Sequence, residues 1–350
     1  MGNICEAFPA FACRIRSLEV RIPMRHFEPF VHLPKSSFPW LEKLVLRFRD
    51  QHPFHVSEKL KSKYPHGIEI FSGSHQLKHV EFDEIGGDSL LKTILFPRDA
   101  VTTLMVGATS HLGTQFTGLY FDALRSMNKL VDCTIQFPGK QSDISSHADQ
   151  PINLPFLQSL TLSASEEVDT GYDVAFFRCL YAPCLKYLWL SVGASENHGE
   201  LVRQLASFRE RSTVSLSSLT LSHFIVRPIS GEDLISLVAV FPSISILRTT
   251  LTSGVLDTSP LMRALVYNPD HPGPLLPNLE ELRLESTTVN GKDVWNLVRS
   301  YWCSNNSRLR MVDILFFTGG TDGGGPYAEL EHESALHGID LTIDLYVYDY

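Results

Sequence analysis

The chain has 350 residues, of which 43% are hydrophobic and 20% charged, and a formal net charge of −9. This composition is typical of an ordered protein, and the length exceeds the usual limit for one globular core unless the architecture is elongated. The negative net charge argues against a nucleic-acid partner, because phosphate binding requires a basic surface.

We expect no signal peptide at the N-terminus. The opening residues, MGNICEAFPAFACRIR, lack the basic start of a signal peptide, and Glu6 interrupts their short apolar run. The uncharged apolar stretch of residues 234–247 contains Pro242 and is too short to cross a bilayer. We therefore expect an intracellular protein, cytoplasmic or nuclear, with no membrane partner, in which residues 1–11 form an N-terminal cap or a frayed segment.

One spacing of leucines recurs along the chain. In the segment LPNLEELRLES, Leu279, Leu282 and Leu284 change from helical to strand spacing within one short run. Repeats of roughly 24–36 residues with this pattern are typical of leucine-rich-repeat proteins. Strict and looser copies begin at Ile15, Leu41, Leu77, Val101, Leu130, Leu157, Leu185, Leu216, Ile244, Leu279 and Leu309.

The segments between these copies carry the signals of helices. SGEDLISLVAVF begins with Ser230 and places Asp233 three residues later, as in a capping box. DTSPLMRALVYN offers Asp257 or Ser259 as an N-cap, with Pro260 at an early helical position. In NGKDVWNLVRSYW, helical spacing predicts a buried face made of Val294, Leu297, Val298 and Tyr301.

A single strand–helix unit of this length cannot bury its apolar stripe, so the units are expected to stack and share one core. The predicted fold class is α/β: one leucine-rich-repeat solenoid, or horseshoe, over residues 12–350, with a parallel sheet on the concave side and helices on the convex side. We expect an inserted loop around residues 138–153 and a glycine-rich connector around residues 318–326. The last strand is expected over residues 339–347.

Residues 313–344 give the strongest argument for an enzyme or a nucleotide-binding protein. An apolar strand, a glycine-rich loop, a helix and Asp344 in the next strand imitate a dinucleotide-binding unit. The glycines do not match G-x-G-x-x-G, however, and Leu309, Val312 and Ile314 already fit the repeat. We keep this reading as the alternative to a non-enzymatic chain, for which we assign no catalytic residue and no cofactor.

Histidines and cysteines show no recognisable metal-site spacing. The histidine pairs in HPFH and HQLKH have no further ligands at a regular distance along the chain. Cys179 and Cys184 lack a second cysteine pair, so zinc is not expected. The cysteines are expected to be buried reduced thiols, and no metal is assigned.

The predicted concave face provides candidate binding residues. Side chains alternate along a strand, so the third, fifth and seventh positions of each repeat should point to this face. Large aromatic anchors beside small residues are typical of an interaction hot spot. In the alternative, Trp189 lies across Thr161 and Thr220 and covers the sheet. The predicted partner-binding residues are Tyr187, Trp189, Thr161, Thr220, Arg248 and Arg283.

The segments YAPCLKYLWL, LPFLQSLTL and LPNLEELRLES resemble repeats of fungal F-box-associated leucine-rich-repeat proteins, particularly those of basidiomycetes. The closing ELEHESALHGIDLTIDLYV is similar to the helix, glycine and strand that end many of them. The resemblance covers most of the chain and implies a protein-interaction scaffold that recruits the substrate of a ubiquitin ligase. In that family an F-box binds a Skp-type adaptor. Because the first repeat begins at Ile15, we expect that adaptor as a partner only if an F-box lies outside this chain.

Overall fold

The computed structural model is an α/β structure of parallel strands joined by helical segments. The chain divides into two compact units, Met1–Leu185 (unit 1) and Lys186–Tyr350 (unit 2). The prediction of one solenoid over residues 12–350 therefore stays a prediction. The structure describes residues 11–23, 26–48, 64–84, 90–108, 117–137, 150–164, 172–191, 198–222, 230–250, 258–266, 275–286, 291–302, 308–318 and 340–347.

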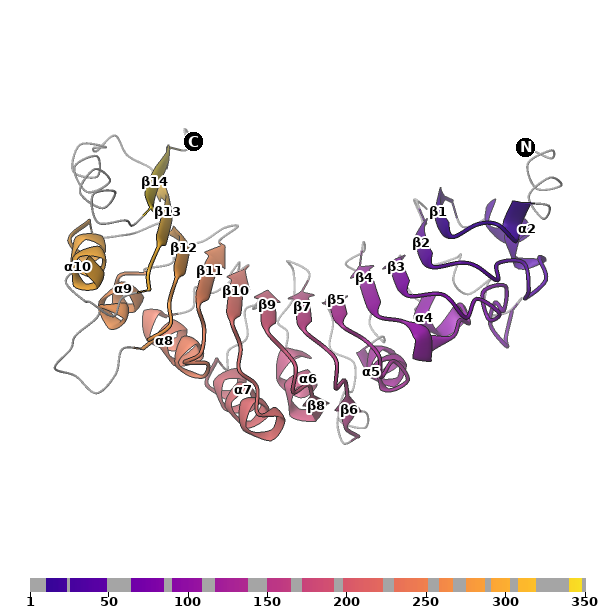
Figure 1. Cartoon of the computed structure of the whole chain (residues 1–350), viewed down its shortest axis with the longest axis horizontal. Helices are drawn as coiled ribbons and strands as arrows, with labels where there is room; N and C mark the ends of the chain where they lie inside the picture. Colours follow the sequence, from indigo (N-terminus) through magenta and orange to yellow (C-terminus); the bar gives the residue numbers. More distant parts are fainter. Residues whose placement is uncertain are drawn as a thin grey trace. The chain divides into compact units, whose positions relative to one another are not determined.

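Unit 1 contains parallel strands that stack in chain order. They pair without offset, so that Lys43 lies opposite both Ser17 and His79. A separate pair of short parallel strands, β6 (Ile152–Asn153) and β8 (Leu180–Tyr181), lies on the helix side (Figure 1). The main strands are β1 (Ser17–Ile22), β2 (Lys43–Phe48), β3 (His79–Glu84), β4 (Thr103–Ala108), β5 (Asp132–Phe137) and β7 (Ser159–Ala164).

Unit 2 repeats this arrangement. Its strands are also parallel, in chain order and without offset, so that Thr220 lies opposite both Trp189 and Arg248. Such sequential stacking is consistent with a solenoid-like arrangement. The strands are β9 (Tyr187–Ser191), β10 (Ser218–Ser222), β11 (Ile246–Thr250), β12 (Glu281–Ser286), β13 (Met311–Thr318) and β14 (Asp340–Val347).

Helices cover one face of the strands in each unit (Figure 1). Unit 1 contains α2 (Glu28–Val31), α4 (Leu90–Thr93), the 3-10 turn η2 (Arg98–Ala100), α5 (Thr117–Arg125) and α6 (Tyr172–Cys179). Unit 2 contains α7 (His198–Ser212), α8 (Gly231–Ala239), α9 (Ser259–Leu265) and α10 (Gly291–Trp302). The helices described in the first repeats of unit 1 span a single turn, whereas the connections of unit 2 contain longer ones.

The recurring leucines form the core, as their spacing predicts. Leu279 and Leu284 are each 1% exposed and Leu282 is fully buried. Burying such a side chain contributes about 1.5–3 kcal/mol, so each repeat adds several kcal/mol to the shared core. Two positions depart from the pattern: Ile15 is only half-buried, and the equivalent of a core leucine in β11 is the buried Thr249.

Nine pairs of neighbouring strands begin with the same two backbone hydrogen bonds. The carbonyl of Lys186, for example, accepts the N–H groups of Ser217 at 2.9 Å and Ser218 at 3.0 Å. These two hydrogen bonds fix the residue at which the next strand starts. They explain why equivalent residues of successive repeats lie side by side. The carbonyls that accept two such bonds are those of Arg16, Glu42, Lys78, Thr102, Val131, Lys186, Ser217, Ser245 and Glu280.

The observed N-caps of the helices agree in part with those predicted from the sequence. The Ser230 hydroxyl caps α8 by accepting the Asp233 N–H at 3.0 Å, as predicted. The prediction for α9 was wrong, because its N-cap is Thr258, although the proline in its first turn was expected. The predicted face of α10 is confirmed, since Val294, Leu297, Val298 and Tyr301 are all buried.

The two predicted irregular segments fall mainly outside the described residues. Residues 138–149 and 319–339 belong to that part of the chain. At the end of the expected inserted loop, Ile152–Asn153 instead forms β6, and Ile152 is fully buried. The last strand, Asp340–Val347, agrees with the prediction to within one residue, and Leu341 is 8% exposed.

Candidate functional site

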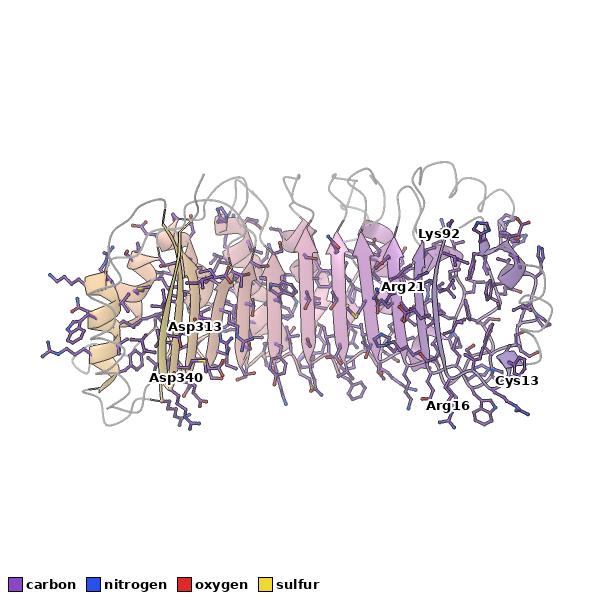
Figure 2. The ribbon with its side chains drawn as sticks, turned by 90° about the horizontal axis from the view of Figure 1, so that it is seen from above. Cys13, Arg16, Arg21, Lys92, Asp313 and Asp340 are labelled. Atoms are coloured by element: carbon purple, nitrogen blue, oxygen red, sulfur yellow. The ribbon has the colours of Figure 1, made fainter. Side chains whose placement is uncertain are left out.

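The strands of each unit present one face away from the helices, which we call the open face; Figure 2 looks onto it. Side chains alternate along a strand, so every second residue of a strand belongs to this face. In unit 2 the in-register pairing places its residues in rows across the strands. The middle row consists of Trp189, Thr220, Arg248, Arg283, Asp313 and Thr342.

Two aromatic side chains lie on the open face of β9, the first strand of unit 2. Tyr187 is 49% exposed and Trp189 is 39% exposed. Within the described residues of unit 2, they are the large hydrophobic side chains with the greatest exposure, and both come from β9. The intervening Leu188 is 2% exposed, so the alternation that buries the core also directs both aromatic rings outward.

Trp189 is held in place by the neighbouring strand. Its indole Nε1 donates a hydrogen bond of 2.7 Å to the hydroxyl oxygen of Ser222. Ser222 lies diagonally across from it on β10 and is fully buried. The indole therefore reaches over β10, and part of it covers the sheet, as the alternative reading of Trp189 supposed. The remaining exposed surface is a fixed apolar platform.

Small residues flank this platform within unit 2. Ser218 is 9% exposed, and Thr220, directly opposite Trp189, is half-buried. β10 carries only the short side chains of Ser and Thr on its open face, so the side chains beside the indole of Trp189 extend little above the sheet. The predicted neighbour Thr161 belongs to β7 of unit 1, where it lies opposite Thr134, so it is not part of the site in unit 2.

Two arginines share one carboxylate in the centre of this face. Arg248 donates a hydrogen bond to Glu281 Oε2 at 3.2 Å, and Arg283 Nε lies 4.0 Å from the same oxygen. Arg283 also donates from its Nη2 to the Met311 sulfur at 3.5 Å. Among the described residues, the Nε atoms of both arginines are buried without a hydrogen-bond partner. One carboxylate thus contacts both guanidinium groups, and two more carboxylates lie on this face close by, Glu285 on β12 and Asp313 opposite Arg283.

The far strands of the same face are acidic. Asp313 lies opposite Arg283 on β13, and Asp340 begins β14 (Figure 2). Thr342 is opposite Asp313 and carries no charge. The open face of unit 2 thus changes from aromatic on β9, through Arg248 on β11 and a mixture of acidic and basic side chains on β12, to acidic on β13 and β14.

The open face of unit 1 carries a network of charges. Arg47 donates from Nε to Glu81 Oε1 at 2.9 Å and lies 3.6 Å from Asp83. Burial raises the pKa of Asp83, and the nearby Arg47 opposes that effect. Burial, together with Lys43, lowers the pKa of His79, whose Nε2 lies 3.9 Å from Glu81. Arg47 thus pairs with both carboxylates, whereas, within the described residues, His79 Nε2 is buried without a hydrogen-bond partner.

Metal binding finds no support in the described part of the chain. No group of three or more His, Cys, Asp and Glu side chains there could hold a metal ion. His75 is exposed, His79 joins the charge network of unit 1, and the HPFH pair lies outside the described residues. The prediction of buried thiols holds for Cys133 and Cys179. It was wrong for Cys13 and Cys184, which lie in turns and are exposed.

The nucleotide-binding alternative stays a prediction. Its glycines lie outside the described residues, while the flanking β13 and β14 pair in parallel like the other strands of unit 2. Stabilisation of the chain by any one of a panel of nucleotides in a thermal-shift experiment would favour this alternative. Among the described residues, no helix is long and apolar enough to cross a membrane.

Ser222 and Glu281 were not among the predicted site residues, although Ser222 bonds to Trp189 and Glu281 contacts both Arg248 and Arg283. Both lie on the open face by strand alternation, so their position could be read from the sequence. Their pairing could not, because a Trp or an Arg side chain reaches more than one neighbouring strand. No protein-family model matches the chain, and no curated protein matches it either.

Proposed function

We propose that this chain is a non-enzymatic protein-interaction scaffold, and that a protein partner binds the open face of unit 2. The observation that best supports this proposal is the exposure of Tyr187 and Trp189 on one strand, with Trp189 fixed by its hydrogen bond to Ser222. A rigid aromatic side chain loses little conformational entropy when a partner covers it. Trp and Tyr are for this reason enriched among the residues that dominate binding energy.

The geometry around the aromatics supports this proposal. A hot spot needs a large apolar contact area together with polar groups that fix the orientation of the partner. Thr220 and Ser218 provide low surface and Arg248 provides N–H donors one strand farther along. The partner-binding set that we propose in unit 2 is Tyr187, Trp189, Thr220, Arg248 and Arg283.

The fold and the pathway that we propose follow from the repeats. Leucine-rich repeats with a parallel sheet inside and helices outside form a horseshoe, whose concave side would be the open face. By resemblance to F-box-associated repeat proteins, the partner would be the substrate of a ubiquitin ligase inside the cell. A Skp-type adaptor would join only through an F-box located outside this chain. We expect no nucleic-acid partner, no cofactor and no metal.

Site-specific crosslinking tests the proposal. A photoreactive phenylalanine replaces Tyr187 in the intact chain, and in a matched variant it replaces the exposed Ser207 on the helix face of the same unit. We expect a discrete crosslinked protein from the first variant and none from the second. Trp189→Ala should then weaken binding of that protein by about 2 kcal/mol or more. Equal crosslinking from both positions, or unchanged binding by Trp189→Ala, would overturn the proposal.

A further inference from the structure

We propose that β14 of one copy of this chain pairs in parallel with β1 of a second copy, so that copies associate head to tail. This inference does not depend on the proposed function, because it concerns the outer edges of β1 and β14 and not the open face of unit 2. The outer edge is the side of β1 away from β2, and the side of β14 away from β13. These two edges are unpaired, match in register and carry opposite charges.

The outer edge of β1 presents backbone groups that no described strand pairs with. Among the described residues, β1 pairs only with β2, and β14 pairs only with β13. The Arg16 carbonyl accepts the Lys43 N–H at 3.0 Å, and the bonding groups of a parallel strand alternate between its two sides. The N–H and C=O groups of Ser17, Glu19 and Arg21 therefore point away from β2. Such an edge is a template for a further strand.

The apolar core is less completely covered at these two edges than one strand farther inside. Leu18 on β1 and Leu341 on β14 are each 8% exposed, whereas Leu44 on β2 and Val312 on β13 are fully buried. A strand added at either edge would remove this remaining apolar surface from water, as each neighbouring strand does within a unit.

The edges of two copies match in register. The described neighbouring strands of both units pair first residue with first residue, as in the pairs β1–β2 and β13–β14. The same rule would place Asp340 opposite Ser17 of the second copy and Leu341 opposite Leu18. A shift by one residue would bring a core side chain against a side chain of the open face, so one register is favoured.

The segments that contain the two edges have opposite net charges. Residues 11–23, which include β1, contain three arginines and one acid. Residues 340–347, which form β14, contain two acids and no Lys or Arg. Two β1 edges, or two β14 edges, would bring like charges together, whereas β14 beside β1 brings opposite charges together. Charge of this kind selects the partner and its orientation.

The charged side chains at both edges are accessible to a second copy. Figure 2 shows Arg16 beside the start of β1 and Asp340 at the start of β14. Arg16 lies 3.5 Å from Glu42 and Arg21 pairs with Glu19, yet the two arginine side chains are 74% and 47% exposed. Exposed pairs of this type are weak, so they leave the arginines free to attract an acidic edge.

Pairing of β14 with β1 does not close on itself. The two edges that meet are different, and after pairing each copy still has one unpaired edge. Association should therefore continue beyond a dimer, and the average mass should keep rising with protein concentration.

Sedimentation equilibrium of the 350-residue chain tests the proposal. The weight-average mass should rise above the 39.3 kDa of one copy as the concentration increases, with no plateau at the dimer. The rise should be smaller at about 500 mM than at about 50 mM NaCl, because salt screens exposed charges. A mass of one copy throughout, up to several hundred micromolar, would overturn the proposal.

Two charge variants test which edges meet. Arg16→Glu/Arg21→Glu makes the edge of β1 acidic, and Asp340→Lys/Thr342→Lys makes the edge of β14 basic. Each variant alone should remain one copy, because its altered edge repels its own other edge. An equimolar mixture should associate again, because each edge then finds an opposite charge. Association of either variant alone to the original extent, or a mixture that stays dissociated, would contradict the pairing.

A backbone variant tests the strand pairing itself. Ser17→Pro removes an N–H that points to the outer edge, and proline is tolerated at the first residue of an edge strand. The variant should be folded by circular dichroism and should not associate; if it is unfolded, the charge variants decide. The controls Arg299→Glu on α10 and Trp189→Ala on the open face should associate like the original chain. Association that Trp189→Ala abolishes and Ser17→Pro preserves would assign the contact to the open face and overturn the proposal.

Discussion

The hydrogen bond between Trp189 and Ser222 should contribute measurably to stability. Its donor is a half-buried indole N–H and its acceptor is the oxygen of a fully buried hydroxyl, 2.7 Å apart. A neutral hydrogen bond of this kind contributes about 0.5–1.5 kcal/mol net, and leaving a buried partner unsatisfied costs about 1–3 kcal/mol. We therefore expect Trp189→Phe to destabilise the chain by about 2 kcal/mol and Ser222→Ala by about 1 kcal/mol.

A double-mutant cycle isolates the bond itself. The variant that combines Trp189→Phe with Ser222→Ala should be less destabilised than the sum of the two single variants, by about 1 kcal/mol. Urea unfolding at 25 °C, followed by far-UV circular dichroism, measures the free energies without using tryptophan fluorescence, which the substitution of one of the four tryptophans changes. The same cycle with Tyr187→Phe in place of Trp189→Phe is the control and should be additive.

The outcome bears directly on the binding site. Additivity of Trp189→Phe and Ser222→Ala, to within about 0.3 kcal/mol, would refute the argument that Ser222 fixes the indole. With coupling, Trp189→Ala is expected to lose stability as well as binding, because the indole buries roughly 100 Å² of apolar surface, worth about 2.5 kcal/mol. Binding measurements on that variant therefore require conditions in which it is fully folded.

Three further predictions concern other parts of the chain. Gly231→Ala should destabilise by about 1–3 kcal/mol in urea unfolding, because the added Cβ would lie 2.5 Å from the ring of Pro260, whereas Gly199→Ala on the exposed face of α7 should stabilise slightly. His79 has a lowered pKa, so its contribution to stability is present above pH 6.5 and lost as the pH falls below it. His79→Gln should therefore lose less thermal stability on acidification, and parallel curves for the two proteins would contradict this. Burial raises the pKa of Cys133, so Cys133→Ser should leave the number of rapidly reacting thiols in the folded chain unchanged and reduce it by one after unfolding.

The core was predictable because the sequence repeats the same spatial requirement. Leu282 and Leu284 occupy equivalent places to Leu219 and Leu221, and all four are buried. Most strands contribute two apolar side chains to the core and meet the next strand without offset, so a wrong assignment in one repeat would conflict with its neighbours. Where the pattern weakens, as at Ile15, the burial weakens too.

The helix starts were less predictable because several residues compete for one position. In the segment that starts α9, Asp257, Thr258 and Ser259 are all good N-caps by residue type, and the structure uses Thr258. The choice depends on where α9 contacts α8 and α10, which no local pattern contains. At α8, by contrast, Gly231 follows Ser230 immediately and leaves a single candidate, so the prediction there was confirmed.

The candidate site was predictable as a face but not as a set of contacts. Strand alternation places Tyr187, Trp189, Arg248 and Arg283 on one side of unit 2, and the structure agrees. That Trp189 bonds to Ser222, and that two arginines share Glu281, depends on which neighbouring strand each long side chain reaches.

The repeat fold separates the residues that stabilise the chain from those available for binding. Core positions on each strand hold Leu or a similar residue, whereas the positions between them vary from Trp to Ser to Arg across unit 2. Substitutions on the open face should therefore change binding with little effect on the core, as expected for surface positions. Trp189 and Ser222 are the exception, because the hydrogen bond between their side chains both stabilises the sheet and fixes a residue of the open face. An aromatic anchor that the sheet itself holds rigid loses less entropy on binding than a freely rotating one, and this is the physical reason to place the partner there.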